Sequence, residues 1–224
     1  MTSPEWQQAI FERDDCVMAD KLLLKVYAQM SDFPDIMIDL RRYHTWEVPF
    51  ERVQPRVQAM ADALEAIEQP LQAILEDPVQ VRKRAASSWL SPVQEVYEAG
   101  TFLIPRVACF HAISTICALS MLEALVGDPT HELEARSYAI SKRIWMFHEQ
   151  ATEVGSLGMH YYPTALLLTY GSAKSEEMKD WIIDLLNSLL ARNPETDVMF
   201  THEEVLQRRF ALSGRLPVDL GFYM

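Results

Sequence analysis

The sequence predicts an all-α fold: a single domain, 1–224, built as a multi-helix bundle. Two features of the composition lead to this expectation. The 224 residues include only seven glycines, and the apolar segments are rich in Leu, Ala, Met and Ile, which favour helix over strand. Hydrophobic residues make up 49% and charged residues 23% of the chain, as in ordinary globular proteins, so one large core can form.

The first half of the chain carries four expected helix starts. Ser3-Pro4-Glu5 combines a cap, a proline and an acidic residue, and a second helix should open at Pro34. The clearest amphipathic helix spans about 50–76, and Pro70 should kink it. Its apolar positions recur at steps of three and four: Val53, Val57, Met60, Leu64, Ile67, Leu71 and Ile74. Ser91-Pro92 repeats the cap-plus-proline pattern and predicts a further helix start.

Residues 101–126 form the most apolar segment, in which only Arg106 and Glu123 are charged. Its interior polar residues, including His111 and Thr115, favour the central helix of a bundle over a membrane span. A turn is expected at Gly127-Asp128-Pro129. Further helices are expected at about 131–153, 160–171, 174–192 and 201–211, which makes about eight to ten helices joined by short connections.

The charge and the cysteines limit the classes of partner and the compartment. A formal charge of −12 argues against nucleic acid or an acidic membrane as a partner. The one basic run, Arg82-Lys83-Arg84, is too short for a nucleic-acid interface and is interpreted as a solvated helix end. The cysteines match neither a disulfide framework nor a zinc spacing, so we expect a reducing, cytoplasmic location. They are Cys16, Cys109 and Cys117.

The familiar catalytic and binding motifs are missing from the sequence. It contains no Gly-rich phosphate loop and no G-x-S-x-G, H-E-x-x-H or C-x-x-C pattern. Three His-Glu pairs occur, but adjacent residues on a helix point about 100° apart and cannot share a metal ion unaided. We therefore expect neither a cofactor nor a metal.

Polar and aromatic side chains set in apolar helices are the candidate functional residues. Each histidine alone is typical of a core residue that is hydrogen-bonded to a backbone carbonyl. Together these side chains could line a pocket between helices that takes a small apolar or aromatic substrate. The set consists of Arg106, His111 and Thr115 on the central helix, Trp145 and His148 on the next, and His160 and Tyr161 at the start of the one after.

Three segments resemble the regulatory domain of fungal-specific transcription factors, the all-helical part that follows a binuclear zinc cluster. They are 135–141 (ARSYAIS), 159–168 (MHYYPTALLL) and 181–186 (WIIDLL). In that family a helix with small and polar residues precedes a Tyr/Phe-Pro step into an apolar helix, and a Trp-bearing helix follows. The resemblance covers about 15–215. The family's six cysteines and basic linker are missing here, so the resemblance implies a domain that does not read DNA.

In length and helical make-up the chain is also similar to the hetero-Diels–Alderases of fungal tropolone sesquiterpenoid pathways. That similarity implies a cofactor-independent pericyclase of secondary metabolism, which joins a tropolone-derived quinone methide to a sesquiterpene. The catalytic donors would then be His111, His148 and Tyr161, and the substrate would contact Arg106, Trp145, His160 and Thr115. The alternative is a solitary regulatory, ligand-sensing or dimerisation domain, which could form a homodimer.

Overall fold

The all-α prediction is confirmed by the computed structural model, which describes residues 17–89, 91–153, 161–192 and 199–212. Within these ranges the structure is mostly helical, and the strands are one pair of five residues each. The predicted helix start at Ser3-Pro4-Glu5, the cysteine at position 16 and the candidate residue His160 lie outside the described residues.

The first half of the chain folds largely as the hydrophobic periodicity predicts. The helix expected at about 50–76 has those bounds, and it continues through Pro70 without a break. Pro34 lies in the first turn of its helix, where its missing N–H costs nothing. The helices are α2 (Met18–Ser31), α3 (Phe33–His44) and α4 (Phe50–Glu76).

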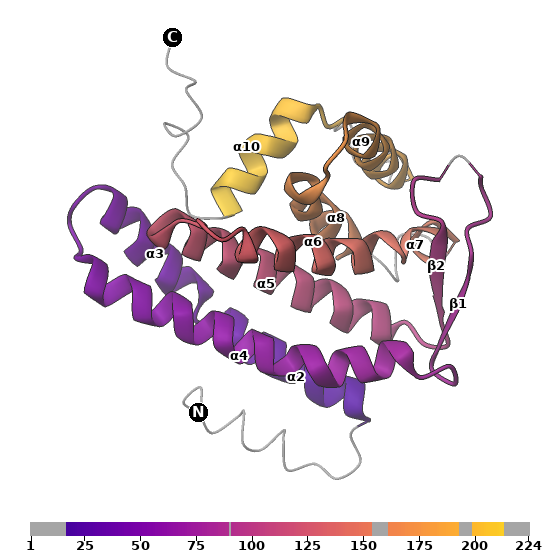
Figure 1. Ribbon diagram of the computed structural model, residues 1–224, viewed down its shortest axis with the longest axis horizontal. Coiled ribbons are helices and arrows are strands. Elements are labelled where there is room, and N and C mark those ends of the chain that lie inside the picture. Colours follow the sequence, from indigo (N-terminus) through magenta and orange to yellow (C-terminus); the bar gives the residue numbers. More distant parts are fainter. Residues whose placement is uncertain (1–16, 90, 154–160, 193–198, 213–224) are drawn as a thin grey trace.

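The central helix is α5 (Leu103–Val126), which packs against α2, α4, α6 and α8. Figure 1 shows it between the α2–α4 tier and the tier formed by α8, α9 and α10. It is long and apolar enough to cross a membrane, but 67% of its most apolar window is buried inside the fold. Packing therefore accounts for its hydrophobicity. Small buried residues let the neighbouring helices approach closely: Ala108, Cys109, Ala112, Cys117 and Ala118.

A β-hairpin replaces the helix that we predicted from Ser91-Pro92, so that prediction is wrong. Strands β1 (Val81–Ala85) and β2 (Glu95–Ala99) pair antiparallel, from Val81 opposite Ala99 to Ala85 opposite Glu95. The Ser91 hydroxyl accepts from the backbone N–H of Val93 and therefore braces the hairpin loop instead of capping a helix. The basic run 82–84, which we interpreted as a helix end, lies in β1.

The single helix predicted at about 131–153 is divided into two, which is a second correction. It breaks at Met146 and Phe147, where the Met146 carbonyl accepts from the Tyr97 N–H of β2 at 2.8 Å. The remaining elements follow the predicted order. They are α6 (Glu132–Trp145), α7 (His148–Glu153), α8 (Tyr162–Thr169), the 3₁₀ turn Tyr170–Ser172, α9 (Glu176–Leu190) and α10 (His202–Leu212).

Candidate functional site

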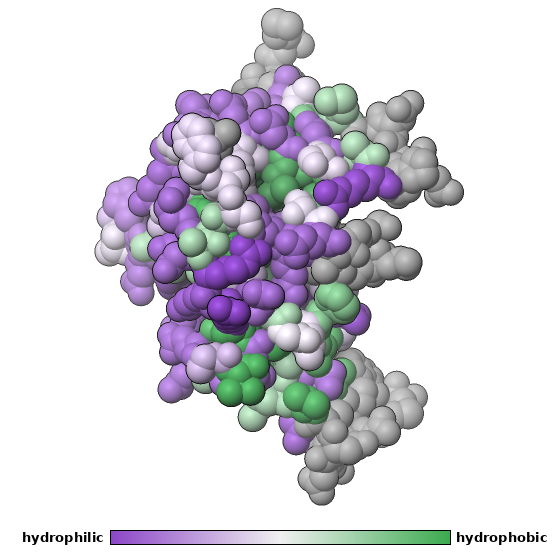
Figure 2. Space-filling view, turned by 90° about the vertical axis from the view of Figure 1, so that its right-hand side faces the viewer, coloured by the Kyte–Doolittle hydropathy of each residue, from purple (hydrophilic) through white to green (hydrophobic). Residues whose placement is uncertain are grey.

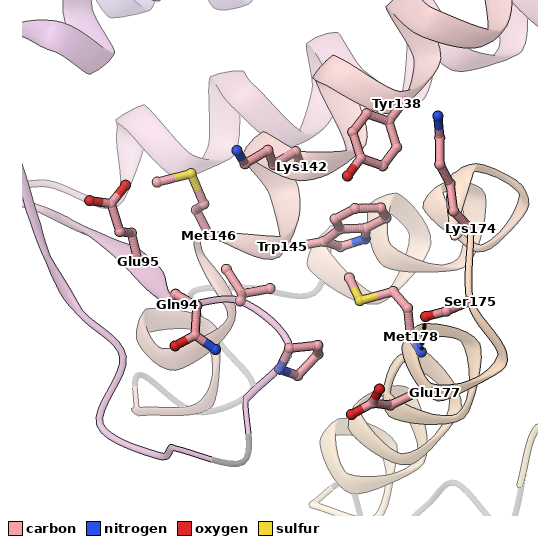
Figure 3. Close-up of a pocket in the computed structure, with 12 residues that line it drawn as sticks. Gln94, Glu95, Tyr138, Lys142, Trp145, Met146, Lys174, Ser175, Glu177 and Met178 are labelled. Atoms are coloured by element: carbon pink, nitrogen blue, oxygen red, sulfur yellow. Dashed lines mark hydrogen bonds between the residues drawn. The ribbon is translucent and has the colours of Figure 1, made fainter.

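A surface groove lies where the hairpin loop, α6 and the start of α9 meet (Figure 3). Its volume of about 500 Å³ falls in the range of ligand pockets, roughly 300–1,000 Å³. Of the predicted site residues that lie in the described ranges, Trp145 lines it. Among the residues that the structure describes, its lining consists of Pro92, Val93, Gln94, Glu95, Tyr138, Lys142, Trp145, Met146, Lys174, Ser175, Glu177 and Met178.

Trp145 and Tyr138 form an ordered aromatic wall at the base of the groove. The Trp145 indole N–H donates to the Thr169 hydroxyl at 2.8 Å, and that hydroxyl donates to the Leu166 carbonyl at 2.7 Å. The Tyr138 ring meets the indole edge to face, with ring centroids 5.8 Å apart. Because its polar atom is already bonded inside the protein, Trp145 offers the groove an apolar surface in a fixed orientation.

Charged side chains surround this aromatic wall. The Lys174 ammonium lies over the Tyr138 ring, 4.8 Å from its centroid, and Figure 3 shows Lys142 and Lys174 on either side of Tyr138. Glu95 and Glu177 are the acidic residues of the described lining, so within it two positive and two negative side chains balance one another. In a chain with a formal charge of −12, this neutral rim distinguishes the groove from the mean surface field.

His111 and Thr115 are brought together as predicted, but inside the core. The His111 ring is fully buried, and its Nε2 lies 3.0 Å from the Leu64 carbonyl and 3.4 Å from the Thr115 hydroxyl. A carbonyl can only accept, so Nε2 carries the proton. Nδ1 has no hydrogen bond and faces Glu68 Oε2 at 3.6 Å.

Glu68 belongs to an ion-pair network that links α4 to α6. Its carboxylate pairs with the guanidinium of buried Arg143, and Arg136 pairs with Glu65 at 3.1 Å one turn away. Burial acts to raise the pKa of Glu68, but the hydrogen bond and charge of Arg143 outweigh it and lower the pKa. Burial lowers the pKa of His111. The ring is therefore neutral at pH 7 and serves the core.

Tyr161 and Arg106 occupy a third place, near the start of α5. The Tyr161 hydroxyl donates to the Phe102 carbonyl at 3.3 Å, and its ring packs on Phe110 with centroids 5.6 Å apart. Arg106 donates to the Tyr27 hydroxyl at 2.9 Å and lies over the same Phe110 ring. Burial raises the pKa of the Tyr161 phenol far above neutrality, so it would act as a donor, never as a base.

His148 follows Trp145 by three residues and begins α7. Its Nδ1 is 3.0 Å from the Trp145 carbonyl, and its ring meets Trp181 edge to face at 5.2 Å. Burial lowers the pKa of His148. Its Nε2 is 3.9 Å from Glu149, too far for a hydrogen bond. Each of the two described candidate histidines therefore has one ring nitrogen at hydrogen-bonding distance from a backbone carbonyl.

The cysteine thiols and the possible metal ligands complete the survey of reactive side chains in the described ranges. Cys109 and Cys117 are buried, and burial raises the pKa of the Cys117 thiol to about 12 and that of Cys109 further. Neither thiol is a nucleophile at neutral pH. Among the described residues, no group of three or more His, Cys, Asp or Glu side chains is arranged to hold a metal ion.

The predicted site residues thus fall into three described groups: His111 with Thr115, Tyr161 with Arg106, and Trp145 with His148. Sequence reasoning missed most of the groove, including Tyr138, Lys142, Lys174 and Met178. Lysine side chains are usually solvated, so no sequence signal marked them as neighbours of an aromatic wall. Comparison of the chain with models of protein families, with curated proteins and with solved structures found no match.

Proposed function

We propose that the chain is a helical binding module whose groove takes an uncharged, mainly apolar small molecule with an aromatic face. The observation that carries this proposal is the stack of Lys174 on Tyr138 and of Tyr138 against Trp145. Aromatic walls with a few polar groups at the rim are typical of ligand pockets. The proposal fits the solitary ligand-sensing domain that the resemblance to fungal regulatory domains implies.

The charge balance of the rim selects the class of ligand. Lys142 and Lys174 are offset by Glu95 and Glu177, so an anion or a cation would meet one attractive and one repulsive pair. The chain's overall charge of −12 adds a further penalty for anions. A neutral molecule avoids both effects and gains from apolar contact, because Val93, Met146 and Met178 line the groove together with Trp145.

Lys174 gives the groove a simple way to accept a planar molecule. Lys174 is exposed, and a cation–π contact at an exposed site contributes only about 0.5–1 kcal/mol. A ring of comparable size can displace the ammonium into water and stack on Tyr138 in its place. Trp145 stays fixed by its bond to Thr169, so the wall is pre-organised, which lowers the entropy cost of binding.

Binding is supported over catalysis by where the candidate donors lie. His111, His148 and Tyr161 each have a polar atom at hydrogen-bonding distance from a backbone carbonyl of the protein, and none of them lines the groove. A catalytic donor has to reach the reacting atom, at about 2.6–3.2 Å. The groove provides apolar contact and two lysine ammonium groups.

The proposal is tested with two naphthalene fluorophores of similar size. One is neutral (6-propionyl-2-dimethylaminonaphthalene) and the other anionic (8-anilinonaphthalene-1-sulfonate). We expect the neutral probe to bind the folded chain more tightly, with Tyr138→Ala weakening it at least tenfold because stacking area is lost. Tyr43→Ala is the matched control, since Tyr43 is another half-buried tyrosine, on α3. Equal loss in both variants, or unchanged binding in Tyr138→Ala, would overturn the proposal.

The cycloaddition hypothesis remains a separate proposal, and one observation favours it. The groove combines a rigid aromatic wall with two ammonium donors, Lys142 and Lys174, which could hold an apolar polyene against a tropolone and polarise its carbonyl. The test is incubation of the chain with a hydroxymethyl tropolone and humulene, followed by mass spectrometry. An adduct formed by the wild type and lost in Tyr138→Ala would establish it. Adduct formation at the protein-free rate would end it.

A further inference from the structure

The basic strand β1 leads directly to Ser87, whose hydrogen bonds hold the hairpin against α7. The exposed residues Arg82 and Lys83 and the half-buried Arg84 lie in β1, in extended backbone, and the chain leaves the strand at Ala86 and Ser87. The Ser87 side chain is exposed. Arginines therefore stand three and five residues before a reachable serine hydroxyl, inside a chain whose formal charge is −12.

Ser87 holds the hairpin to α7 through one carboxylate. Its backbone N–H donates to Glu149 Oε1 at 2.6 Å, and its hydroxyl donates to Glu149 Oε2 at 2.9 Å. Arg84 Nη1 completes the cluster, 2.6 Å from Glu149 Oε2 and 3.2 Å from the Ser87 hydroxyl. Two further carboxylates, Glu98 and Glu153, lie 3.7 and 3.9 Å from the same guanidinium.

We propose that Ser87 is a phosphorylation site, recognised by a protein kinase that selects basic residues, and that the phosphate releases the hairpin from α7. The Ser87 oxygen would attack the γ-phosphorus of ATP. A new O–P bond forms, the bond from that phosphorus to the ADP oxygen breaks, and the hydroxyl proton passes to the catalytic base of the kinase. The arginines of β1 supply the charge that an acidic kinase groove recognises.

The effect of the phosphate follows from the charges around Ser87. It brings about −1.5 to −2 charges to a position where the Ser87 hydroxyl now lies 2.9 Å from the Glu149 carboxylate. The Arg84 guanidinium is already within reach of the Ser87 oxygen and would pair with the more highly charged phosphate. Glu149 would then lose both its hydroxyl donor and its cation. Like charges in contact favour separation, so the hairpin leaves α7.

The same loop contributes Pro92, Val93 and Gln94 to the groove, so its release would also move one groove wall. The inference itself does not depend on a groove ligand. It requires a phosphate on Ser87 and a loosened hairpin, and both are measured on the free chain. Failure of the ligand proposal would therefore leave it intact.

The first measurement is the site and rate of phosphorylation. The full chain is incubated with Mg²⁺, ATP and a purified kinase that selects arginine at three and five residues before serine, and the product is mapped by mass spectrometry. We expect one phosphate on Ser87, lost in Ser87→Ala and retained in Ser88→Ala. Arg82→Ala should slow the reaction at least tenfold. Phosphate mainly on another residue, or an unchanged rate in Arg82→Ala, would overturn the proposal.

The second measurement is amide hydrogen exchange of the phosphorylated and unphosphorylated chains. We expect the amides of Ser87 and Tyr97, which bond to Glu149 and to the Met146 carbonyl, to exchange at least tenfold faster after phosphorylation. The amides of α5 should not change, which separates local release from unfolding. A stoichiometrically phosphorylated chain whose hairpin amides stay equally protected would refute the release.

Discussion

Helix α6 carries a buried charged side chain on the face toward α4 and an exposed one on the face toward the groove. Toward α4, Arg143 is buried and paired with Glu68, next to the neutral ring of His111. Toward the groove, Lys142 is exposed beside Tyr138 and Trp145. The two faces belong to the same helix, and Arg143 follows Lys142 in the chain.

The difference lies in what each charge would lose if its partner were removed. A buried ion left without its partner cannot be rehydrated without opening the core, so the first face tolerates little change. An exposed lysine can swing into water at a cost of less than about 1 kcal/mol. Stability should therefore depend on the Arg143 face, and binding on the Lys142 face. On the hairpin side of the molecule, Figure 2 shows small hydrophobic patches that are separated by hydrophilic surface.

The largest expected effect is on the buried face. Arg143→Met should lower the free energy of unfolding by about 2–4 kcal/mol, because Glu68 loses its cation while remaining mostly enclosed. The value lies below that of a fully buried pair because 36% of the Glu68 side chain is exposed. Arg136→Met, on the same face but paired with an exposed Glu65, should cost less than about 1 kcal/mol. Urea unfolding followed by circular dichroism measures the free energy of unfolding of both variants. An equal loss in the two would contradict the difference expected between the buried and the exposed ion pair.

The helices could be predicted because their evidence is local. The spacing of apolar residues in α4 defines a helix whatever surrounds it, and the same holds for the apolar run of α5. The hairpin could not be predicted, because β1 carries three consecutive basic residues and shows no alternation. The bond from Tyr97 to Met146 that divides α6 from α7 joins two residues far apart in the sequence, so no local pattern could reveal it.

The groove was even less accessible to sequence reasoning. Trp145 was a candidate, as a large aromatic residue on an apolar helix. Its neighbours in the groove come from α6, from α9 and from a loop that we predicted as a helix start. The histidines were candidates because an imidazole can act as an acid, a base or a hydrogen-bond donor. The described structure shows His111 and His148 at hydrogen-bonding distance from main-chain carbonyls. Residue type alone did not separate a core donor from a ligand contact.

A change of pH should test the buried side of this comparison, with a smaller effect. Burial lowers the pKa of His111, so the unfolded chain takes up a proton near pH 6.5 that the folded chain resists. Stability due to this ring is therefore present above pH 6.5 and lost as the pH falls below it, by about 1 kcal/mol between pH 7.5 and 5.5. The charged groups around the ring are Glu68 on α4 and Arg143 and Arg136 on α6.

His111→Gln tests this pH dependence, because the amide can still donate toward the Leu64 carbonyl. The variant should be less stable than the wild type at pH 7.5 but should lose about 1 kcal/mol less on going to pH 5.5. His148→Gln should reduce the slope in the same direction, since burial also lowers the pKa of His148. Urea unfolding at the two pH values measures all three chains. An unchanged slope in His111→Gln would show that the ring is not the group that resists protonation.

The smallest effect is expected at the groove, where Lys174 covers Tyr138. Lys174→Ala removes an exposed cation from a half-buried ring, so the free energy of unfolding should fall by no more than about 0.5–1 kcal/mol. The uncovered ring should bind the neutral naphthalene probe about twofold more tightly, since about 0.5 kcal/mol is no longer spent on displacing the ammonium. Lys142→Ala is the control, because that lysine belongs to the rim and its removal does not uncover the ring. Fluorescence titration of both variants gives the two affinities. If Lys174→Ala weakens the probe while Lys142→Ala does not, Lys174 contacts the ligand directly, and the groove would depend on a fixed charge as the core face of α6 does.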